Sequence, residues 1–278
     1  RFWRAAIQPL GPGQVFIVLR DETDARRTER MRADFLANAS HELRTPLASL
    51  SGFVETLRTH ARNDPEARAR FLSIMDEQAG RMRRLVDDLL SLSRIEMNEH
   101  VRPRDAVDLA GVVRDVAGAS APILAARGVT IEVDSPEKLM VVGDYDQLVQ
   151  VAHNLVDNAV KYSPAGASVR VTTRTVTAEA ARAPLRADTV SLSLLDPRGG
   201  AKDRYGAMWV SDEGPGVPRQ HLPRLSERFY RVSGQKAAGT GLGLAIVKHI
   251  VNRHRGGLVV ESAEGAGTTF CVYVPAAS

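Results

Sequence analysis

The sequence predicts an α+β protein in which an antiparallel helical hairpin precedes an α/β sandwich. Residues 26–97 carry two long apolar repeats with steps of three and four, which is the helical period. From Asp105 onward, strand patterns mix with helix patterns, which indicates helices packed on one face of a mixed sheet. The length of 278 residues, with 44% hydrophobic and 25% charged residues, suits about two globular domains.

Composition narrows the class of protein. The one cysteine, Cys271, excludes an internal disulfide framework and permits a reducing compartment. The net charge of +4 comes from arginines spread along the chain, which favours solvated helix faces over a nucleic-acid patch. The longest apolar run near the start, Val15–Leu19, is far too short to cross a bilayer.

The chain opens with a strand pattern. Residues 2–9 and 14–20 are predicted as two short strands joined by Gly11-Pro12-Gly13. Two strands alone are marginally stable, so we expect residues 1–20 to be the end of a larger upstream domain. Residues 21–34 are charged and are predicted to form a connector helix.

The helical hairpin follows, with arms over residues 26–59 and 66–97. Asp64 is predicted to cap the second arm, and Pro65 to occupy its first helical position. The apolar stripes are wide enough that we expect a partner hairpin and a four-helix bundle in a homodimer. The alternative is a monomeric arm packed on the second domain. We place the linker helix and dimerisation region at 21–102, and the second domain at 103–278.

His41 is the first candidate for chemistry. It lies about 200° of helix rotation from both Ala39 and Leu43, so it faces away from the apolar stripe. A histidine on the wet side of a packed helix, with Glu42 beside it, is placed to act as a nucleophile. The stripe itself comprises Leu36, Ala39, Leu43, Leu47, Leu50, Val54 and Leu57.

The second half is predicted to contain six strands and three helices. The strands cover residues 129–133, 139–142, 168–175, 207–211, 257–262 and 268–274, and the helices cover 109–127, 145–161 and 241–254. An Ala- and Arg-rich stretch, 176–204, is predicted as an inserted hairpin with a strand-like segment at 189–195.

Three segments of the second half are candidates for one nucleotide site. Asn154, Asn158 and Lys161 share a helix face, and amide oxygens beside a lysine suit a hydrated Mg²⁺ that bridges phosphates. A solvated amide face is the alternative for this segment alone. The turn at 212–216 brings glycines close to a ligand, although such a sequence is first of all a turn. Residues 239–243 open a helix whose N–H groups form an anion site, but their spacing does not fit a Rossmann loop.

Taken in order, these segments resemble the sensor histidine kinases of two-component systems over about residues 31–275. Residues 41–46 resemble the phosphoacceptor box of the HisKA region. Residues 154–162, 212–216 and 239–243 resemble the N, G1 and G2 boxes of the GHKL-type ATP-binding domain, HATPase_c. The lead at 35–41 and the strand pair before it are most similar to the phosphate-responsive PhoR branch, with the tail of a PAS sensor domain at 1–20.

The resemblance implies a role for each matching residue. It implies that His41 is phosphorylated, that Glu42 accepts its proton, and that Thr45 orients water when the partner is dephosphorylated. It also implies that Asn158 is the Mg²⁺ ligand, with support from Asn154. The remaining ATP-binding positions are Lys161 at the phosphates, Tyr162 stacked on adenine, Asp212 at the adenine amine, Gly214 and Gly216 in the turn, and Gly239, Thr240, Gly241 and Gly243 in the phosphate loop.

One segment departs from the family pattern. The F box usually has two phenylalanines around Glu-Arg, and here Ser226 replaces the first. This change predicts a lid that packs less firmly on the nucleotide, while Arg228 and Arg231 remain available for phosphate contact.

The resemblance implies an enzyme that uses ATP and Mg²⁺ to phosphorylate itself on His41. It then passes the phosphoryl group to an aspartate of a response regulator, and it also acts as a phosphatase toward that regulator. The resemblance further implies a homodimer with no direct nucleic-acid partner. Because the chain opens with Arg, we expect a fragment of a longer protein. The resemblance implies that this portion is cytoplasmic and that the full-length protein is anchored in the bacterial cell membrane.

Two alternatives remain open at this point. A nucleotide-regulated phosphatase or scaffold with weak kinase activity has only Ser226 in its favour. A chaperone- or topoisomerase-type ATPase shares the nucleotide fold. Such enzymes place a water-activating glutamate where this chain has Asn154, an amide with no basic character.

Overall fold

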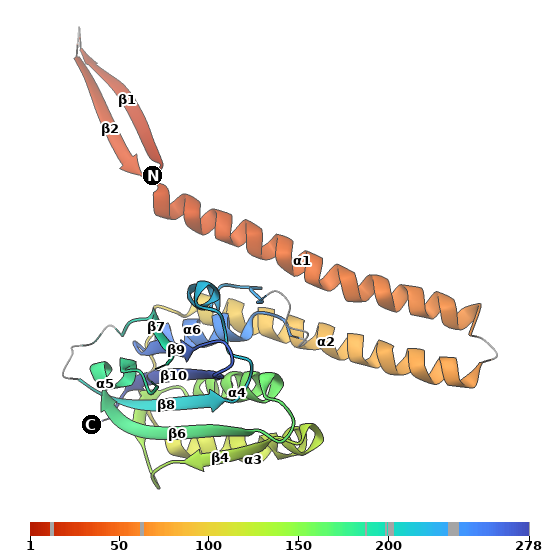
Figure 1. Ribbon diagram of the computed structural model, residues 1–278. Coiled ribbons are helices and arrows are strands. Elements are labelled where there is room, and N and C mark those ends of the chain that lie inside the picture. The colour runs from red at the N-terminus through yellow and green to blue at the C-terminus, as the bar shows by residue number, and fades with distance from the viewer. Residues whose placement is uncertain are drawn as a thin grey trace. The chain divides into compact units, whose positions relative to one another are not determined.

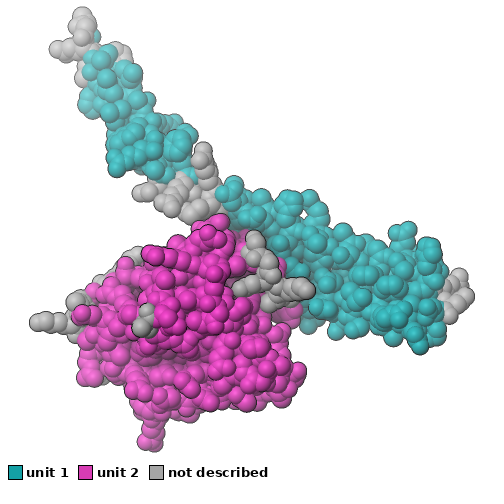
Figure 2. All heavy atoms as spheres, viewed as in Figure 1, with its two compact units in different colours: residues 1–83 teal, residues 84–278 magenta. Residues whose placement is uncertain are grey.

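The computed structural model describes residues 1–11, 14–61, 64–186, 188–197, 199, 203–232 and 239–277 (Figure 1). These residues form two compact units, 1–83 and 84–278 (Figure 2). The division lies inside the second long helix, so the last part of that helix belongs to the same unit as the mixed sheet.

The first unit begins with the predicted pair of strands. β1 (Trp3–Gly11) pairs antiparallel with β2 (Gln14–Asp21), with Ile7 opposite Ile17. The described apolar side chains of this ribbon are exposed, among them Trp3 and Leu19. Uncovered apolar surface of this kind is typical of a segment that packs against other protein, and the larger upstream domain stays a prediction.

Two long helices confirm the predicted hairpin, and the second of them continues into the other unit. α1 (Thr23–Arg58) is continuous with the predicted connector, and α2 (Pro65–Met97) begins at the predicted proline. Asp64 Oδ1 accepts a hydrogen bond from the Ala67 N–H at 2.9 Å, as a helix cap does. The predicted turn also includes Asn63, which lies outside the described residues. Pro46 lies inside α1 and has no N–H for the carbonyl one turn earlier.

The apolar stripe of α1 is only partly covered within one chain. Phe53 and Phe71 bring the two helices into contact, with ring centroids 5.5 Å apart. Leu36, Leu47 and Val54, in contrast, are 43–65% exposed. Large apolar side chains left in water on one face are typical of a surface that pairs with another copy, so the homodimer remains our prediction.

The second unit is built on a six-stranded mixed sheet of order β4-β6-β8-β10-β9-β7. β4 and β6 are parallel, and the other neighbours are antiparallel. Its strands are β4 (Thr130–Asp134), β6 (Ser168–Thr177), β7 (Val190–Leu195), β8 (Arg204–Asp212), β9 (Gly257–Ser262) and β10 (Thr268–Pro275). A separate two-stranded sheet pairs β3 (Asp105–Asp108) with β5 (Met140–Gly143).

The three predicted helices pack on this sheet as α3 (Leu109–Arg127), α4 (Tyr145–Tyr162) and α6 (Gly243–Arg253), with the short 3₁₀ helix η1 (Arg219–Arg224) before the last. α3 has well-defined ends, because the Asp108 side chain caps its start and Gly128 closes it at φ 63°. α3 is also the one helix among the described residues that is long and apolar enough to span a bilayer. It packs here against α4, with six of its residues buried.

The insertion at 176–204 joins the main sheet. It forms a short helix, α5 (Ala178–Arg182), and then β7, which pairs with the edge strand β9. The buried Glu261 carboxylate accepts hydrogen bonds from the N–H groups of Leu185 and Arg186, both at 2.8 Å, and from the Thr189 hydroxyl. The central part of the insertion is therefore anchored to β9.

Candidate functional site: a phosphoacceptor helix and a nucleotide cleft

His41 lies exposed in α1, as the apolar periodicity predicts. Glu42 is half-buried, and its Oε2 lies 3.0 Å from Nη2 of Arg81 on α2. The Thr45 hydroxyl donates a hydrogen bond to the His41 carbonyl at 3.2 Å, so both side chains stand on the same face of the helix. The ion pair joins the Glu42 carboxylate to α2, and the role of Glu42 as the base for His41 remains a prediction.

The second unit brings the three predicted nucleotide segments together. A methyl group at Gly239 would lie 2.5 Å from Lys161 Nζ, so the phosphate loop runs directly over that cation. A methyl at Gly243 would lie 3.1 Å from Asn154 Oδ1. The N box on α4 and the G2 box at the start of α6 therefore face each other across a gap that side chains larger than glycine would fill.

The G1 turn approaches the same end of α4. A methyl at Gly214 would lie 2.8 Å from the Tyr162 carbonyl oxygen. Lys161 Nζ lies 3.2 Å from the Tyr162 hydroxyl and 4.7 Å from the centre of its ring. Gly216 and Gly241 have φ values of 70° and 72°, which side chains rarely adopt, so glycine is required at both turns.

Asp212 lies at the end of β8 and is only 6% exposed. Its Oδ1 accepts hydrogen bonds from the N–H groups of Gly214 at 2.8 Å and Thr268 at 3.2 Å. Among the described residues, no hydrogen bond reaches Oδ2, which leaves that oxygen for a ligand. Burial raises the pKa of Asp212 to about 6, although the two backbone N–H groups act in the opposite direction.

The F-box departure has a structural outcome. Ser226 is buried, and its hydroxyl accepts a hydrogen bond from Lys248 Nζ on α6 at 3.3 Å. The position is thus filled by a polar contact where the family pattern has an aromatic ring. Arg231 is exposed, whereas Arg228 forms an ion pair with Glu96 of α2. Residues 233–238, which belong to the predicted lid, lie outside the described residues.

The end of α2 contacts the phosphate loop, which was not expected from the sequence. The Thr240 hydroxyl donates to Asp88 Oδ2 at 2.7 Å, and burial raises the pKa of this carboxyl. Glu96, the partner of Arg228, also lies 3.6 Å from the His249 ring. Two side chains predicted to bind phosphate, Thr240 and Arg228, are therefore paired with carboxylates of α2.

Further contacts hold this arrangement. His249 lies 3.5 Å from Glu99, which also accepts a hydrogen bond from Asn252. Ser91 and Gln150 form a hydrogen bond between α2 and α4. A continuous helical repeat gives no local signal that its last turns contact α4, α6 and the phosphate loop, so sequence reasoning missed these residues.

The residues at the N box fit a magnesium ion better than a transition metal. Among the described residues, no group of three or more His, Cys, Asp or Glu side chains could hold a metal. Asn158 is half-buried on the same face of α4 as Asn154 and Lys161. Mg²⁺ keeps several waters and binds through one or two protein oxygens together with phosphates, so an amide oxygen here suffices.

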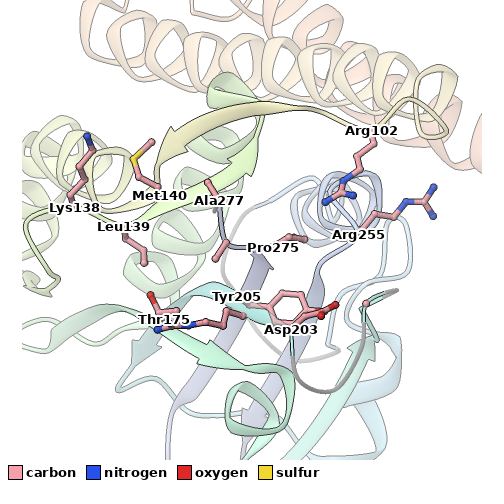
Figure 3. A pocket seen from close by; sticks show the side chains of 13 residues that line it. Arg102, Lys138, Leu139, Met140, Thr175, Asp203, Tyr205, Arg255, Pro275 and Ala277 are labelled. Carbon is pink, nitrogen blue, oxygen red and sulfur yellow. The ribbon is translucent and has the colours of Figure 1, made fainter.

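A separate pocket of about 860 Å³ lies away from the boxes (Figure 3). It is lined by residues of the α2–β3 connection, of β5, β6, β8 and β10 with the segments next to them, and by Arg255 just beyond α6. None of the predicted nucleotide residues lines it. The pocket is therefore separate from the predicted ATP site.

Two family models match the chain. The "His Kinase A (phospho-acceptor) domain" matches residues 31–98, and the "Histidine kinase-, DNA gyrase B-, and HSP90-like ATPase" matches residues 143–278. The phosphate regulon sensor protein PhoR of Pseudomonas aeruginosa is 36% identical over 270 residues, which are 96% of this chain and 55% of that protein. The sensor-like histidine kinase SenX3 of Mycolicibacterium smegmatis is 32% identical over 93% of this chain and 61% of that protein.

A solved structure extends the likeness of fold to almost the whole chain. The histidine kinase ThkA, in complex with the response regulator protein TrrA, has a TM-score of 0.63 and 20% identity over 95% of this chain and 70% of that chain.

A phosphoacceptor helical hairpin joined to a GHKL-type nucleotide domain defines a protein histidine kinase, and the chain belongs to the sensor histidine kinases of two-component systems. Within that family it is of the PhoR type. The chain spans about half the length of the curated relatives it matches.

Proposed function

We propose that this protein phosphorylates His41 with ATP and then passes the phosphoryl group to an aspartate of a response regulator in phosphate-type signalling. The observation that carries the proposal is the meeting of the three nucleotide boxes at one end of α4, together with an exposed histidine next to a fixed carboxylate. In the proposed step, the bond between the γ-phosphorus and the ADP oxygen breaks as Nε2 of neutral His41 bonds to phosphorus. Glu42 takes the ring proton, and ADP leaves.

Each of the three nucleotide boxes has a role in the proposed reaction. Phosphoryl transfer depends on positioning and charge neutralisation more than on covalent help. In the proposal, Lys161 and the N–H groups at the start of α6 neutralise the diphosphate, and Asp212 Oδ2 accepts a hydrogen bond from the adenine amine. Bound Mg²⁺, held by Asn158 with support from Asn154, would neutralise phosphate charge. Tyr162 supplies a ring for stacking.

The contact between α2 and the phosphate loop represents a resting arrangement in this proposal. Asp88 and Glu96 hold Thr240 and Arg228, so phosphates must displace these carboxylates before the loop closes on them. The same protein is proposed to dephosphorylate the regulator, with Thr45 positioning the attacking water. We propose that this region works on the cytoplasmic side of a membrane-anchored homodimer.

Incubation with γ-³²P-ATP and Mg²⁺ tests the proposal. Wild type should acquire label that is labile in acid and stable in base, and His41→Gln should acquire none. His100→Gln, at another exposed histidine, is the matched control and should be labelled like wild type. Label retained in His41→Gln would remove that residue from its role. Nucleotide binding without label in wild type would instead favour the phosphatase or scaffold.

A further inference from the structure

The pocket away from the nucleotide boxes is lined by four cations and one carboxylate. Arg102, Lys138, Arg204 and Arg255 line it together with Asp203. None of the four cations forms an ion pair within the part of the chain that the structure describes. Elsewhere in the same unit, exposed arginines such as those at 170 and 174 are paired with carboxylates. Among the residues that the structure describes, the lining of this pocket therefore carries more cations than carboxylates, and its cations lack ion-pair partners.

Arg255 adopts a backbone conformation that normally belongs to glycine. It follows the end of α6 with φ 60°, and the N–H of Gly256 returns to the Val251 carbonyl at 2.9 Å, as in a helix end closed by a left-handed residue. Such a conformation is strained for any residue with a Cβ. A strained arginine at a position suited to glycine suggests that its side chain has a use.

The pocket also holds a buried hydroxyl that has no partner. Tyr205 is 1% exposed, and its hydroxyl forms no hydrogen bond with the described residues. Burial and the nearby Asp203 carboxylate raise the pKa of this phenol, so it keeps its proton and remains a donor. Figure 3 shows Tyr205 and Asp203 together on one side of the pocket, with Arg102 and Arg255 above them. A buried donor without an acceptor is uncommon unless a ligand supplies one.

From these features we infer that the pocket is a second ligand site, which binds an organic phosphate ester. Arginines recognise phosphate through paired N–H donors, and the Tyr205 hydroxyl adds a further donor. Leu139, Pro275 and Ala277 supply apolar surface for the carbon part of the ligand. The volume of about 860 Å³ lies in the range of small-molecule sites. The phosphate group belongs either to a soluble metabolite or to a phospholipid headgroup.

The position of the site gives it a regulatory consequence. Arg102 belongs to the connection between α2 and β3, and its neighbour Val101 accepts a hydrogen bond from Arg253 Nε at 2.9 Å. A phosphate held by both Arg102 and Arg255 would tie this connection to the end of α6. That consequence depends on the proposed kinase function, because the two units must move for transfer. The binding itself does not depend on it.

The experiment titrates the full chain with phenyl phosphate, followed by ³¹P NMR. Wild type should bind saturably, and Arg102→Gln/Arg255→Gln should bind at least tenfold more weakly. The matched control, Arg170→Gln/Arg174→Gln, removes the same charge from exposed arginines of β6 and should stay within twofold of wild type. An equal loss in this control would show non-specific charge attraction and would overturn the site. The site would also be overturned if the wild-type chain neither bound phenyl phosphate saturably nor bound to the lipid vesicles.

Two single variants separate a ligand role from a structural one. Arg255→Gly removes strain, so the melting temperature should stay the same or rise while phenyl phosphate binds three- to tenfold more weakly. Tyr205→Phe removes an unpartnered hydroxyl, so it should weaken binding about threefold without lowering the melting temperature. A lower melting temperature in both variants would assign these residues to the fold and refute the ligand role.

A vesicle arm distinguishes the sources of the phosphate. The chain is sedimented with vesicles of phosphatidylglycerol and with vesicles of phosphatidylcholine. Retention on the first alone, lost in the Arg102→Gln/Arg255→Gln variant, would identify a lipid headgroup. Binding of phenyl phosphate without such retention would identify a soluble ester. Labelling of His41 is measured in parallel, so failure of the kinase proposal is seen separately from failure of the site.

Discussion

Replacement of Asp212 by asparagine should raise the free energy of unfolding and lower the affinity of the site for the nucleotide. The side chain is buried at the end of β8, and burial raises its pKa from 3.8 to about 6. A carboxylate that is harder to ionise in the folded chain than in the unfolded chain destabilises the fold at neutral pH. Asparagine keeps an oxygen for the Gly214 and Thr268 N–H groups and carries no charge.

The magnitude follows from the shift. The difference between about 6 and 3.8 is about 2.2 pKa units, which at about 1.4 kcal/mol per unit is roughly 3 kcal/mol at pH 7. The sign is set by proton binding. Between pH 3.8 and about 6 the folded state binds more protons than the unfolded state, so stability falls as pH rises through that window. The advantage of Asp212→Asn should therefore grow from roughly 0.5 kcal/mol at pH 4 to roughly 3 kcal/mol at pH 7.

The assay is urea unfolding followed by the fluorescence of Trp209, which is buried in the sheet beside the site. The chain has two tryptophans, so a Trp3→Phe background leaves Trp209 as the sole reporter. Nucleotide affinity is measured on the same samples and should fall, because an asparagine in the same orientation does not accept the adenine amine as a carboxylate does. Asp188→Asn, at an exposed aspartate of the same unit, is the control and should change neither property.

Two results would refute this reasoning. A stability difference that is the same at pH 4 and pH 7 would show that the charge of Asp212 does not destabilise the fold. Destabilisation by Asp212→Asn at pH 7 would show that the backbone hydrogen bonds to the carboxylate outweigh its desolvation.

Three further predictions concern the kinase machinery. Asn158→Ala should abolish the gain in ATP affinity on adding Mg²⁺, as measured by titration with and without the metal, while Asn98→Ala should retain it. Asp88→Ala should release Thr240 and strengthen ATP binding several-fold, because the phosphates no longer compete with a carboxylate; an unchanged dissociation constant would contradict that competition. Thr45→Ala should leave histidine labelling intact and slow dephosphorylation of the response regulator, and equal phosphatase rates would exclude the water-positioning role.

Much of the fold follows from local sequence patterns. The predicted helix 109–127 has the observed bounds of α3, because its apolar content is local and the residues that end it, Asp108 and Gly128, are its immediate neighbours in sequence. The start of α2 at Pro65 has the same origin. The short β3 and α5 were not predicted, because four or five residues carry too little periodicity to stand out. The strand expected in the insertion is present as β7. Its pairing with β9 is a tertiary contact between distant segments, which local sequence patterns do not predict.

The candidate sites divide in the same way. The nucleotide boxes are short contiguous motifs, and the structure brings them together as expected. The carboxylates of α2 that contact the phosphate loop have no local signature, since Asp88 and Glu96 look like any charged residues on a solvated helix. The basic pocket draws Arg102, Lys138 and Arg255 from segments far apart in sequence. Only a folded chain shows that these cations share one cavity.

The proline inside α1 gives the helix a point of mechanical compliance. Pro46 cannot donate a hydrogen bond to the carbonyl of Glu42. We therefore expect α1, the longest helix among the described residues, to bend most easily within about one turn of His41. A twist or push applied at the β1–β2 end would bend the rod there before it reached Arg58. The imidazole would then be reoriented by deformation of its own backbone, without any change in the helical turns beyond.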